Sequence, residues 1–398
     1  MTAKSSIQIG FNKFRERRSG ERLLIDPILL ICSFSLLVIG LVMMMSASIS
    51  VADKVFGDPF YYFNRQIIFA FVGLVVGFVV WKIPLQVWDL SRSIFLVAGL
   101  LLLVALLIPG VGHSVNGSTR WINIGGFGFQ ISEVIKVFMV IYLAGFLKKH
   151  QESLADSIKP VFVPMVLLFI VSLLLLAQPD FGATVVIAIT VLSMLWFAGL
   201  KLRFFALISV LLGVALAFIA FSKDYRVERL TSFLDPWKDK WDSGFQLSNS
   251  LIAFGRGEWF GVGLGESVQK LGYLPEAHTD FVFAVLAEEL GVVGAIVVIF
   301  LFALIAWRAF SIGRRLLQKQ DYFGGYLCYG LGAGLIFQAY VNIGVNMGVL
   351  PTKGLTLPLM SYGGSSMVMS CIAIALLLRA DYELRFQYNE EPLERRAK

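Results

Sequence analysis

Long apolar runs, separated by short polar segments, dominate the chain. A helix needs about 20 predominantly apolar residues to cross the hydrocarbon core of a bilayer. The two runs on either side of Gln178-Pro179-Asp180 could form one broken helix. The run at residues 133–147 differs from the others, because it carries the charged residues Glu133 and Lys136. The pattern therefore predicts about ten membrane-spanning helices, at residues 27–47, 66–83, 93–109, 133–147, 160–177, 182–200, 203–221, 281–307, 323–346 and 357–379.

The composition agrees with this pattern. Hydrophobic residues make up 57% of the 398 residues and charged residues only 15%, a balance that excludes an ordinary soluble domain. We therefore expect an all-α integral membrane protein with one large loop, at about residues 222–281, between the seventh and eighth helices. The helical domain is expected at residues 27–380, after a basic arm at 1–26 and before a tail at 381–398.

Basic residues predict how the chain is oriented in the membrane. In the short loops, lysine and arginine gather on one side of the predicted bundle, together with both ends of the chain. Cytoplasmic loops carry the excess of basic residues, so both termini are predicted to be cytoplasmic and the loop 222–281 extracytoplasmic. The net charge of +7 indicates attraction to anionic membrane lipids and gives no sign of nucleic-acid binding.

A polar heptapeptide, Pro275 to Phe281, closes the long loop just before an apolar run. It places Asp280 and His278 at the mouth of the predicted bundle, where a substrate held in the membrane can present a polar headgroup. Glu288 would share a helix face with Asp280 if the helix begins that early. Ionisable residues near membrane spans are costly to bury and are usually tied to function or pairing. This segment is therefore the first candidate for the chemistry.

A second group of polar residues precedes and enters the fourth predicted span. Arg120 and Trp121 lie in the loop before it, and Glu133 and Lys136 lie at its start. The spacing of Glu133 and Lys136 allows an ion pair within one helix, and a substrate-binding role is an equal alternative. Trp121 fits either stacking on a substrate or an anchor at the membrane interface.

Several motifs together resemble the SEDS family of bacterial cell-wall polymerases, over about residues 27–385. The motifs that carry the resemblance are Gly117 to Trp121, Pro275 to Phe281, Ala287 to Gly291, Pro351 to Pro358 and Ser361 to Ser366. Within the family, the runs Phe254 to Glu258 and Ser267 to Leu271 are more similar to the division branch than to the elongation branch.

The resemblance implies a peptidoglycan glycosyltransferase that polymerises lipid II at the outer face of the bacterial cytoplasmic membrane, at the division septum. Asp280 is then expected to be the general base, and an N-cap of the eighth helix is its structural alternative. A divalent cation, Mg²⁺ or Mn²⁺, is also implied, although the sequence shows no ligand set for it. The cations expected for the leaving pyrophosphate are Arg120, Lys136, Arg256 and Lys353. The other residues expected to bind substrate are Trp121, Glu133, His278, Glu288 and Thr356.

Partners are implied by the resemblance as well. Proteins like this one pair with a single-span transpeptidase, a class B penicillin-binding protein of the FtsI type, and with other division membrane proteins. Three alternatives stay open: a transporter that flips lipid II between leaflets, an elongation-type polymerase, and a noncatalytic scaffold. A helical bundle fits a transporter equally well. The recognisable motifs lie at the predicted extracytoplasmic end, however, and this favours the polymerase.

Overall fold

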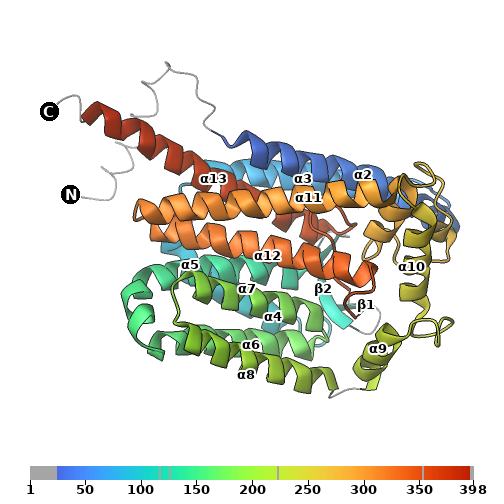
Figure 1. Cartoon of the computed structure of the whole chain (residues 1–398), viewed down its shortest axis with the longest axis horizontal. Helices are drawn as coiled ribbons and strands as arrows, with labels where there is room; N and C mark the ends of the chain where they lie inside the picture. Colours follow the sequence, from blue (N-terminus) through green and yellow to red (C-terminus); the bar gives the residue numbers. More distant parts are fainter. Residues whose placement is uncertain (1–24, 116–117, 125–126, 222–223, 352–353, 395–398) are drawn as a thin grey trace.

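The computed structural model describes residues 25–115, 118–124, 127–221, 224–351 and 354–394. It is a bundle of long helices, with a small sheet and two shorter helices at one end (Figure 1). The helices are α2 (Pro27–Phe56), α3 (Tyr61–Lys82), α4 (Leu85–Ala105), α5 (Ile131–Asp156), α6 (Phe162–Ala177), α7 (Phe181–Phe197), α8 (Leu202–Phe221), α9 (Asp224–Leu234), α10 (Phe245–Gly257), α11 (Val282–Gln318), α12 (Tyr322–Asn346) and α13 (Gly364–Glu394).

Each of the ten predicted helices coincides with a helix of the structure, and the chain is a multi-pass membrane protein. In the described part of the chain, seven helices are long and apolar enough to cross a membrane, and α7 is a shorter apolar helix. The turn at Gln178-Pro179-Asp180 separates α6 from α7, so these residues divide two helices. The full number of spans stays a prediction.

Several helices extend beyond the apolar runs that predicted them. Helix α2 continues to Phe56 and α11 to Gln318, whereas α4 already begins at Leu85. Charged and polar residues end an apolar run without ending a helix, because most of them have adequate helix propensity. The parts of α2 and α11 beyond the apolar runs therefore project past the predicted membrane spans.

A three-stranded antiparallel sheet lies between α4 and α5 in the chain, where the sequence suggested a loop. It consists of β1 (His113–Val115), β2 (Ser118–Ile124) and β3 (Phe127–Gln130), in that order. Trp121 of β2 is paired with Gln130 of β3, and Ile122 with Phe129. Aromatic and β-branched residues at these positions favour a pleated strand. The expectation of a loop is therefore wrong for this segment, although the fold remains almost entirely helical.

The described ends of the chain lie together. The start of α2 and the end of α13 are at one end of the bundle, opposite α9, α10 and the sheet (Figure 1). Arg308 of α11 donates from Nε to Oδ2 of Asp26 at 2.7 Å, and a nitrogen of Arg385 lies 3.8 Å from the same oxygen. This arrangement agrees with termini on one side of the membrane. Which side that is stays a prediction.

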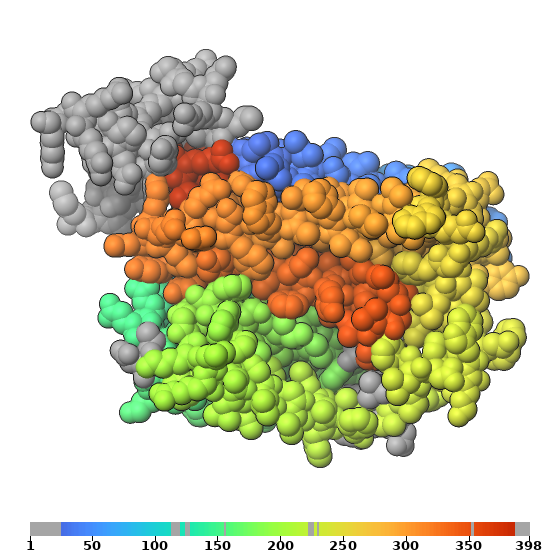
Figure 2. All heavy atoms as spheres, viewed as in Figure 1, coloured from blue at the N-terminus to red at the C-terminus, as the bar shows by residue number. Residues whose placement is uncertain are grey.

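The bundle presents apolar side chains over much of its surface. Phe71 of α3 and Phe218 of α8 are 66% and 77% exposed, as suits helices that face lipid. On the face shown in Figure 2, side chains of α11 and α12 fill the middle, and the segment from α9 to the start of α11 covers one end. The long loop between α8 and α11 therefore lies at that end.

Helix α11 is broken at Gly291, whose φ of 67° and ψ of −169° are not helical. The segment Glu258 to Gly263 crosses the break and pairs with it through four backbone hydrogen bonds. The amides of Val262 and Gly263 donate to the carbonyls of residues 288 and 289, at 3.0 and 3.2 Å. The amides of residues 292 and 293 donate back to the carbonyls of residues 258 and 259, at 2.9 and 3.1 Å. The break in α11 is therefore stabilised by specific backbone hydrogen bonds.

Candidate functional site

Asp280 is partly buried and lies two residues before the start of α11. Two buried amides of α12 hold its backbone: Nδ2 of Asn342 and Nδ2 of Asn346 both donate to the carbonyl of Asp280, each at 2.9 Å. The Oδ1 atom of Asn346 also accepts from the amide of Ala284 at 3.0 Å, which satisfies a donor in the first turn of α11. The position of Asp280 is therefore fixed by a second helix.

The loop that leads into α13 lies directly beside Asp280. A Cβ atom placed at Gly354 would be 3.0 Å from Oδ2 of Asp280. Asn342, which holds Asp280, also donates to the carbonyl of Leu355 at 2.6 Å. Lys353 lies outside the described residues, so its place relative to Asp280 stays a prediction.

Thr356 follows in the same loop and is bonded on two sides. Its carbonyl accepts from Nε2 of Gln338 at 3.0 Å, and its hydroxyl donates to Oγ of Ser366 at 2.8 Å. The loop is thereby tied to α12 and to the first turn of α13. Thr356 thus belongs to the same group of side chains as Asp280.

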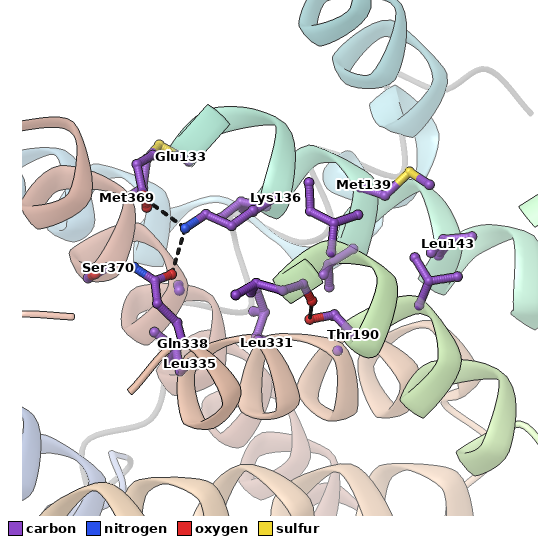
Figure 3. Close-up of a pocket in the computed structure, with 18 residues that line it drawn as sticks. Glu133, Lys136, Met139, Leu143, Thr190, Leu331, Leu335, Gln338, Met369 and Ser370 are labelled. Atoms are coloured by element: carbon purple, nitrogen blue, oxygen red, sulfur yellow. Dashed lines mark hydrogen bonds and ion pairs between the residues drawn. The ribbon is translucent and has the colours of Figure 1, made fainter. Parts of the chain in front are cut away.

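Lys136 joins this group from α5. Its Nζ atom donates to Oε1 of Glu133 at 2.8 Å and to Oε1 of Gln338 at 2.6 Å (Figure 3). The ion pair within one helix is therefore present, and a substrate-binding role for either residue stays a prediction. Gln338 places Lys136 one hydrogen-bonded residue away from Thr356.

A cavity of about 50 Å³ lies next to Lys136, between α5, α7, α12 and α13. Its lining is mostly apolar, with Thr190 and Ser370 as further polar members. A volume of this size has room for roughly three or four waters. The cavity can therefore hydrate Lys136.

Arg120 and Trp121 are placed by the sheet rather than by a loop. Arg120 donates from Nε to the carbonyl of Gln178 at 3.3 Å, and its NH1 lies 3.8 Å from Oδ1 of Asp180. Asp180 also caps α7, because its Oδ1 accepts from the amide of Ala183 at 3.1 Å. Arg120 is thereby tethered to the turn between α6 and α7.

His278 is 7% exposed and lies under Tyr62 of α3, with ring centroids 4.5 Å apart. Its carbonyl accepts from the amide of Tyr362 at 2.9 Å. Burial lowers the pKa of His278, and the charge of Glu276 acts in the opposite direction. His278 therefore joins the Asp280 loop to α3 and to the segment before α13, with its neutral form favoured.

Glu288 and Arg256 lie within a separate polar cluster. Glu288 is fully buried and accepts from the hydroxyl of Ser267, from the amides of Val268 and Gln269 at 3.1 and 3.3 Å, and from NH1 of Arg256 at 3.4 Å. Its described partners are thus all internal. A substrate contact by Glu288 stays a prediction, and the geometry assigns it the task of anchoring the long loop.

A neighbouring buried pair anchors the same loop. Nζ of Lys270 donates to Oε1 of Glu289 at 2.7 Å and to the hydroxyl of Ser46 at 2.7 Å, so that the loop, α11 and α2 meet. Lys270 was not singled out in the sequence as a partner of Glu289. Loop and helix lie close only in the folded chain, so sequence spacing gives no signal for this pair.

The structure thus brings together Asp280, Thr356, Glu133 and Lys136 around three amides of α12 that sequence reasoning missed. Gln338, Asn342 and Asn346 recur every four residues in an otherwise apolar helix, so they share one face. That spacing is the signal that could have identified them. Arg120 with Trp121 and Glu288 with Arg256 belong to two other groups, and β3 links the first of these to α13 through Gln130 and Ser365.

The described residues offer no ready metal site. Among them, no three His, Cys, Asp or Glu side chains form a group that could hold a metal ion. The side chains grouped with Asp280 are amides, hydroxyls and the ion pair of Lys136 with Glu133, whose carboxylate is already bound to the lysine. A divalent cation therefore stays a prediction.

Taken together, a bundle of apolar helices with a carboxylate, a lysine and buried amides at one end defines a multi-pass membrane protein with a polar site at the end of its bundle. Residues 27–386 match the family described as "Cell cycle protein", FtsW/RodA/SpoVE. The chain belongs to this family, and the resemblance to SEDS proteins is confirmed.

Relatives and solved structures agree with the family. A relative from Legionella pneumophila, named "Probable peptidoglycan glycosyltransferase FtsW", is 51% identical over 92% of both chains. A relative of the same name from Thioalkalivibrio sulfidiphilus is 53% identical over 88% of this chain and 87% of its own. Among solved structures, a chain of a peptidoglycan synthase complex has a TM-score of 0.73 and 30% identity over 91% of this chain and 99% of its own. The rod shape determining protein RodA of Thermus thermophilus has a TM-score of 0.66 and 27% identity over 90% and 96%.

Proposed function

We propose that this protein is a peptidoglycan glycosyltransferase of the FtsW type, which polymerises lipid II at the outer face of the cytoplasmic membrane during septal cell-wall synthesis. The identity of about half of all residues to FtsW relatives over nearly the whole chain supports this activity. The observation that carries the mechanism is the place of Asp280, partly exposed at the end of the bundle and held by two asparagines.

Asp280 is the proposed general base. In the reaction, the 4-hydroxyl of the acceptor N-acetylglucosamine attacks the anomeric carbon of N-acetylmuramic acid in the growing strand. The hydroxyl proton passes to the carboxylate of Asp280, the new glycosidic bond forms, and the bond to undecaprenyl pyrophosphate breaks. A positioned carboxylate can contribute about 10²–10⁴-fold to such a step.

The leaving pyrophosphate requires fixed positive charge. Lys136 uses two of its three donors on Glu133 and Gln338, which leaves one for a phosphate oxygen. Arg120, Arg256 and Lys353 are the other proposed cations, and Arg120 and Lys353 are favoured because each belongs to a family motif. Fixed charge in a site shielded from water stabilises developing anionic oxygen more strongly than it does in solution.

Two further proposals concern groups outside this chain. A Mg²⁺ or Mn²⁺ ion would find its main ligands on the substrate pyrophosphate, since the described residues provide no ligand set. A class B penicillin-binding protein of the FtsI type is the proposed partner, because a solved relative belongs to a complex that coordinates polymerization and crosslinking. Cytoplasmic termini and the septal location belong to the same proposal.

The test is polymerisation of labelled lipid II by purified protein, with and without the cognate transpeptidase and a divalent cation. Wild type with its partner is expected to produce long glycan, and Asp280→Ala and Asp280→Asn none. Normal polymer from either variant would remove Asp280 from the mechanism. If wild type makes no polymer from lipid II that another polymerase can use, the flippase alternative takes its place and is tested by leaflet translocation.

Cell-based tests separate the two remaining alternatives. The gene is expected to restore division in cells depleted of their own FtsW and to fail in cells depleted of RodA. The reverse result would assign the chain to elongation. If Asp280→Ala restored division as well as wild type, a noncatalytic scaffold would replace the enzyme.

A further inference from the structure

We propose that Asn342 is a positioning residue for polymerisation, which fixes Asp280 and the loop of Gly354 and Leu355 at one separation. This inference rests on the proposed function. It concerns a residue of α12 that lies inside the bundle, with 1% of its surface exposed.

The side-chain amide of Asn342 bridges two segments that are otherwise far apart in the sequence. Its Nδ2 atom donates to the carbonyl of Asp280 at 2.9 Å and to the carbonyl of Leu355 at 2.6 Å. An amide nitrogen carries two hydrogens, so both donors are used. The segment with the proposed base and the loop beside its carboxylate are therefore joined through one nitrogen atom.

The two neighbouring amides of α12 make the same face a template for the whole site. Asn346, one turn further, donates to the same carbonyl of Asp280 and accepts from Ala284. Gln338, one turn earlier, accepts from Lys136 and donates to Thr356. A single rigid helix thus sets the places of the proposed base, one proposed cation and the loop between them.

The proposed reaction requires a fixed distance between the base and the cations. The base must reach a sugar hydroxyl while the cations reach the leaving pyrophosphate, so their separation has to match one substrate. A misplacement of about 1 Å can reduce the rate of a chemical step by about 10²-fold. Backbone carbonyls buried in the site also need donors, since an unpaired polar group in a membrane bundle is costly.

The decisive variant is Asn342→Asp, which keeps the shape of the side chain and removes at least one of its two donors. Burial disfavours the charged carboxylate, and the neutral acid has only one O–H donor, so it could hold only one of the two carbonyls and the two segments should move apart. The expected result is a fall in kcat of about 10²-fold with the KM for lipid II unchanged. Because Asn346 still holds Asp280, the variant is expected to stay folded, as measured by size exclusion and thermal unfolding.

A second variant and a matched control separate positioning from general stability. Asn342→Gln keeps two donors on a longer side chain, so it should retain more activity than Asn342→Asp. Asn249 of α10 is also buried, and its Nδ2 donates to the carbonyl of Phe245 in its own helix. Asn249→Asp should leave kcat unchanged.

The possible outcomes are distinct. Wild-type kcat in a folded Asn342→Asp variant overturns the positioning assignment, and so does an equal loss in Asn249→Asp. If neither Asn342 variant folds, Asn342 is required for folding and the assignment also fails. In each of these cases a polymerising wild type and an inactive Asp280→Ala leave the proposed function intact, whereas failure of the wild type itself would overturn the proposed function.

Discussion

Gly354 lies against the side chain of Asp280, so closely that a Cβ atom at position 354 would stand 3.0 Å from Oδ2 of the carboxylate. The loop before α13 and the segment before α11 therefore form the two walls around the proposed base. Because glycine has no side chain, it leaves space for the carboxylate of Asp280. The side-chain amide of Asn342 donates hydrogen bonds to both segments, to the carbonyls of Asp280 and Leu355.

Gly354→Ala is expected to slow polymerisation by about tenfold or more while the protein stays folded. Gly354 is exposed, and the crowded atom is the end of a side chain that can move aside, so the displacement falls on the carboxylate. The measurement is kcat on labelled lipid II together with the thermal midpoint. Gly213→Ala on α8 is the control, because a Cβ atom there meets nothing within 4 Å. Equal rates for both variants would contradict the prediction.

Removing Lys136 is expected to affect stability and activity separately. Lys136→Met leaves the buried Glu133 without its cation, which should cost about 3–5 kcal/mol of stability. Adding Glu133→Gln should restore the thermal midpoint, while polymerisation stays at least about 10²-fold below wild type, because a phosphate-binding charge is missing. Recovery of activity in the double variant would reduce the role of Lys136 to the ion pair.

The pair of Lys270 and Glu289 provides the matched control for that experiment. It is equally buried, but it lies between the long loop and α2 rather than beside Asp280. The double variant Lys270→Met with Glu289→Gln is therefore expected to keep both fold and activity. Lys270→Met alone should lower stability by about 3–5 kcal/mol.

His278 is expected to make stability depend on pH. Burial lowers its pKa in the folded protein, so below pH 6.5 the unfolded chain binds a proton that the folded chain resists. Stability should therefore be complete above about pH 6.5 and fall as the pH drops towards the folded-state pKa. Thermal midpoints of wild type and His278→Phe, at about pH 7.5 and about pH 5.5, test this. The variant can still stack on Tyr62, and it should lose part of the pH dependence; an identical dependence in both proteins would count against His278.

Gly291→Ala is expected to prevent folding of the bundle. A Cβ atom at Gly291 would lie 2.4 Å from the amide nitrogen of Gly261, and the positive φ of 67° is strained for alanine. The yield of monodisperse protein after detergent extraction measures the effect, again with Gly213→Ala for comparison. Extraction of folded Gly291→Ala at wild-type yield would show that the crossing segment can move away from α11.

The helices could be predicted from the sequence because a membrane requires long apolar runs, and each run is visible by itself. The sheet at Ser118–Ile124 was missed because its strands are short and lie in a polar, glycine-containing stretch. The length of α11 was underestimated because Arg308 and Arg315 end the apolar run but continue the helix. The local pattern of apolar residues thus identifies the segments that cross the membrane. It does not show how far each helix continues beyond the membrane.

The site was predictable only in part, and for a related reason. Asp280 and His278 lie in a polar segment next to an apolar run, so both could be identified as candidate site residues from the sequence alone. In the sequence, Asn342 and Asn346 are two polar residues in an apolar helix, with no sign of a partner. In the structure, both bind the carbonyl of Asp280, which lies more than sixty residues earlier in the chain. Contacts over such separations depend on the packed bundle, and spacing along the chain does not encode them.

The break at Gly291 has a consequence for biogenesis. The amides of Val292 and Val293 and the carbonyls of Glu288 and Glu289 are bonded to Glu258–Gly263, and an unpaired peptide group in lipid costs several kcal/mol. The turns of α11 on either side of Gly291 therefore reach their final form only when the segment Glu258–Gly263 has folded back onto them. Folding of the long loop and completion of α11 therefore depend on each other, so a loop that fails to fold back would also disturb the segment that carries Asp280.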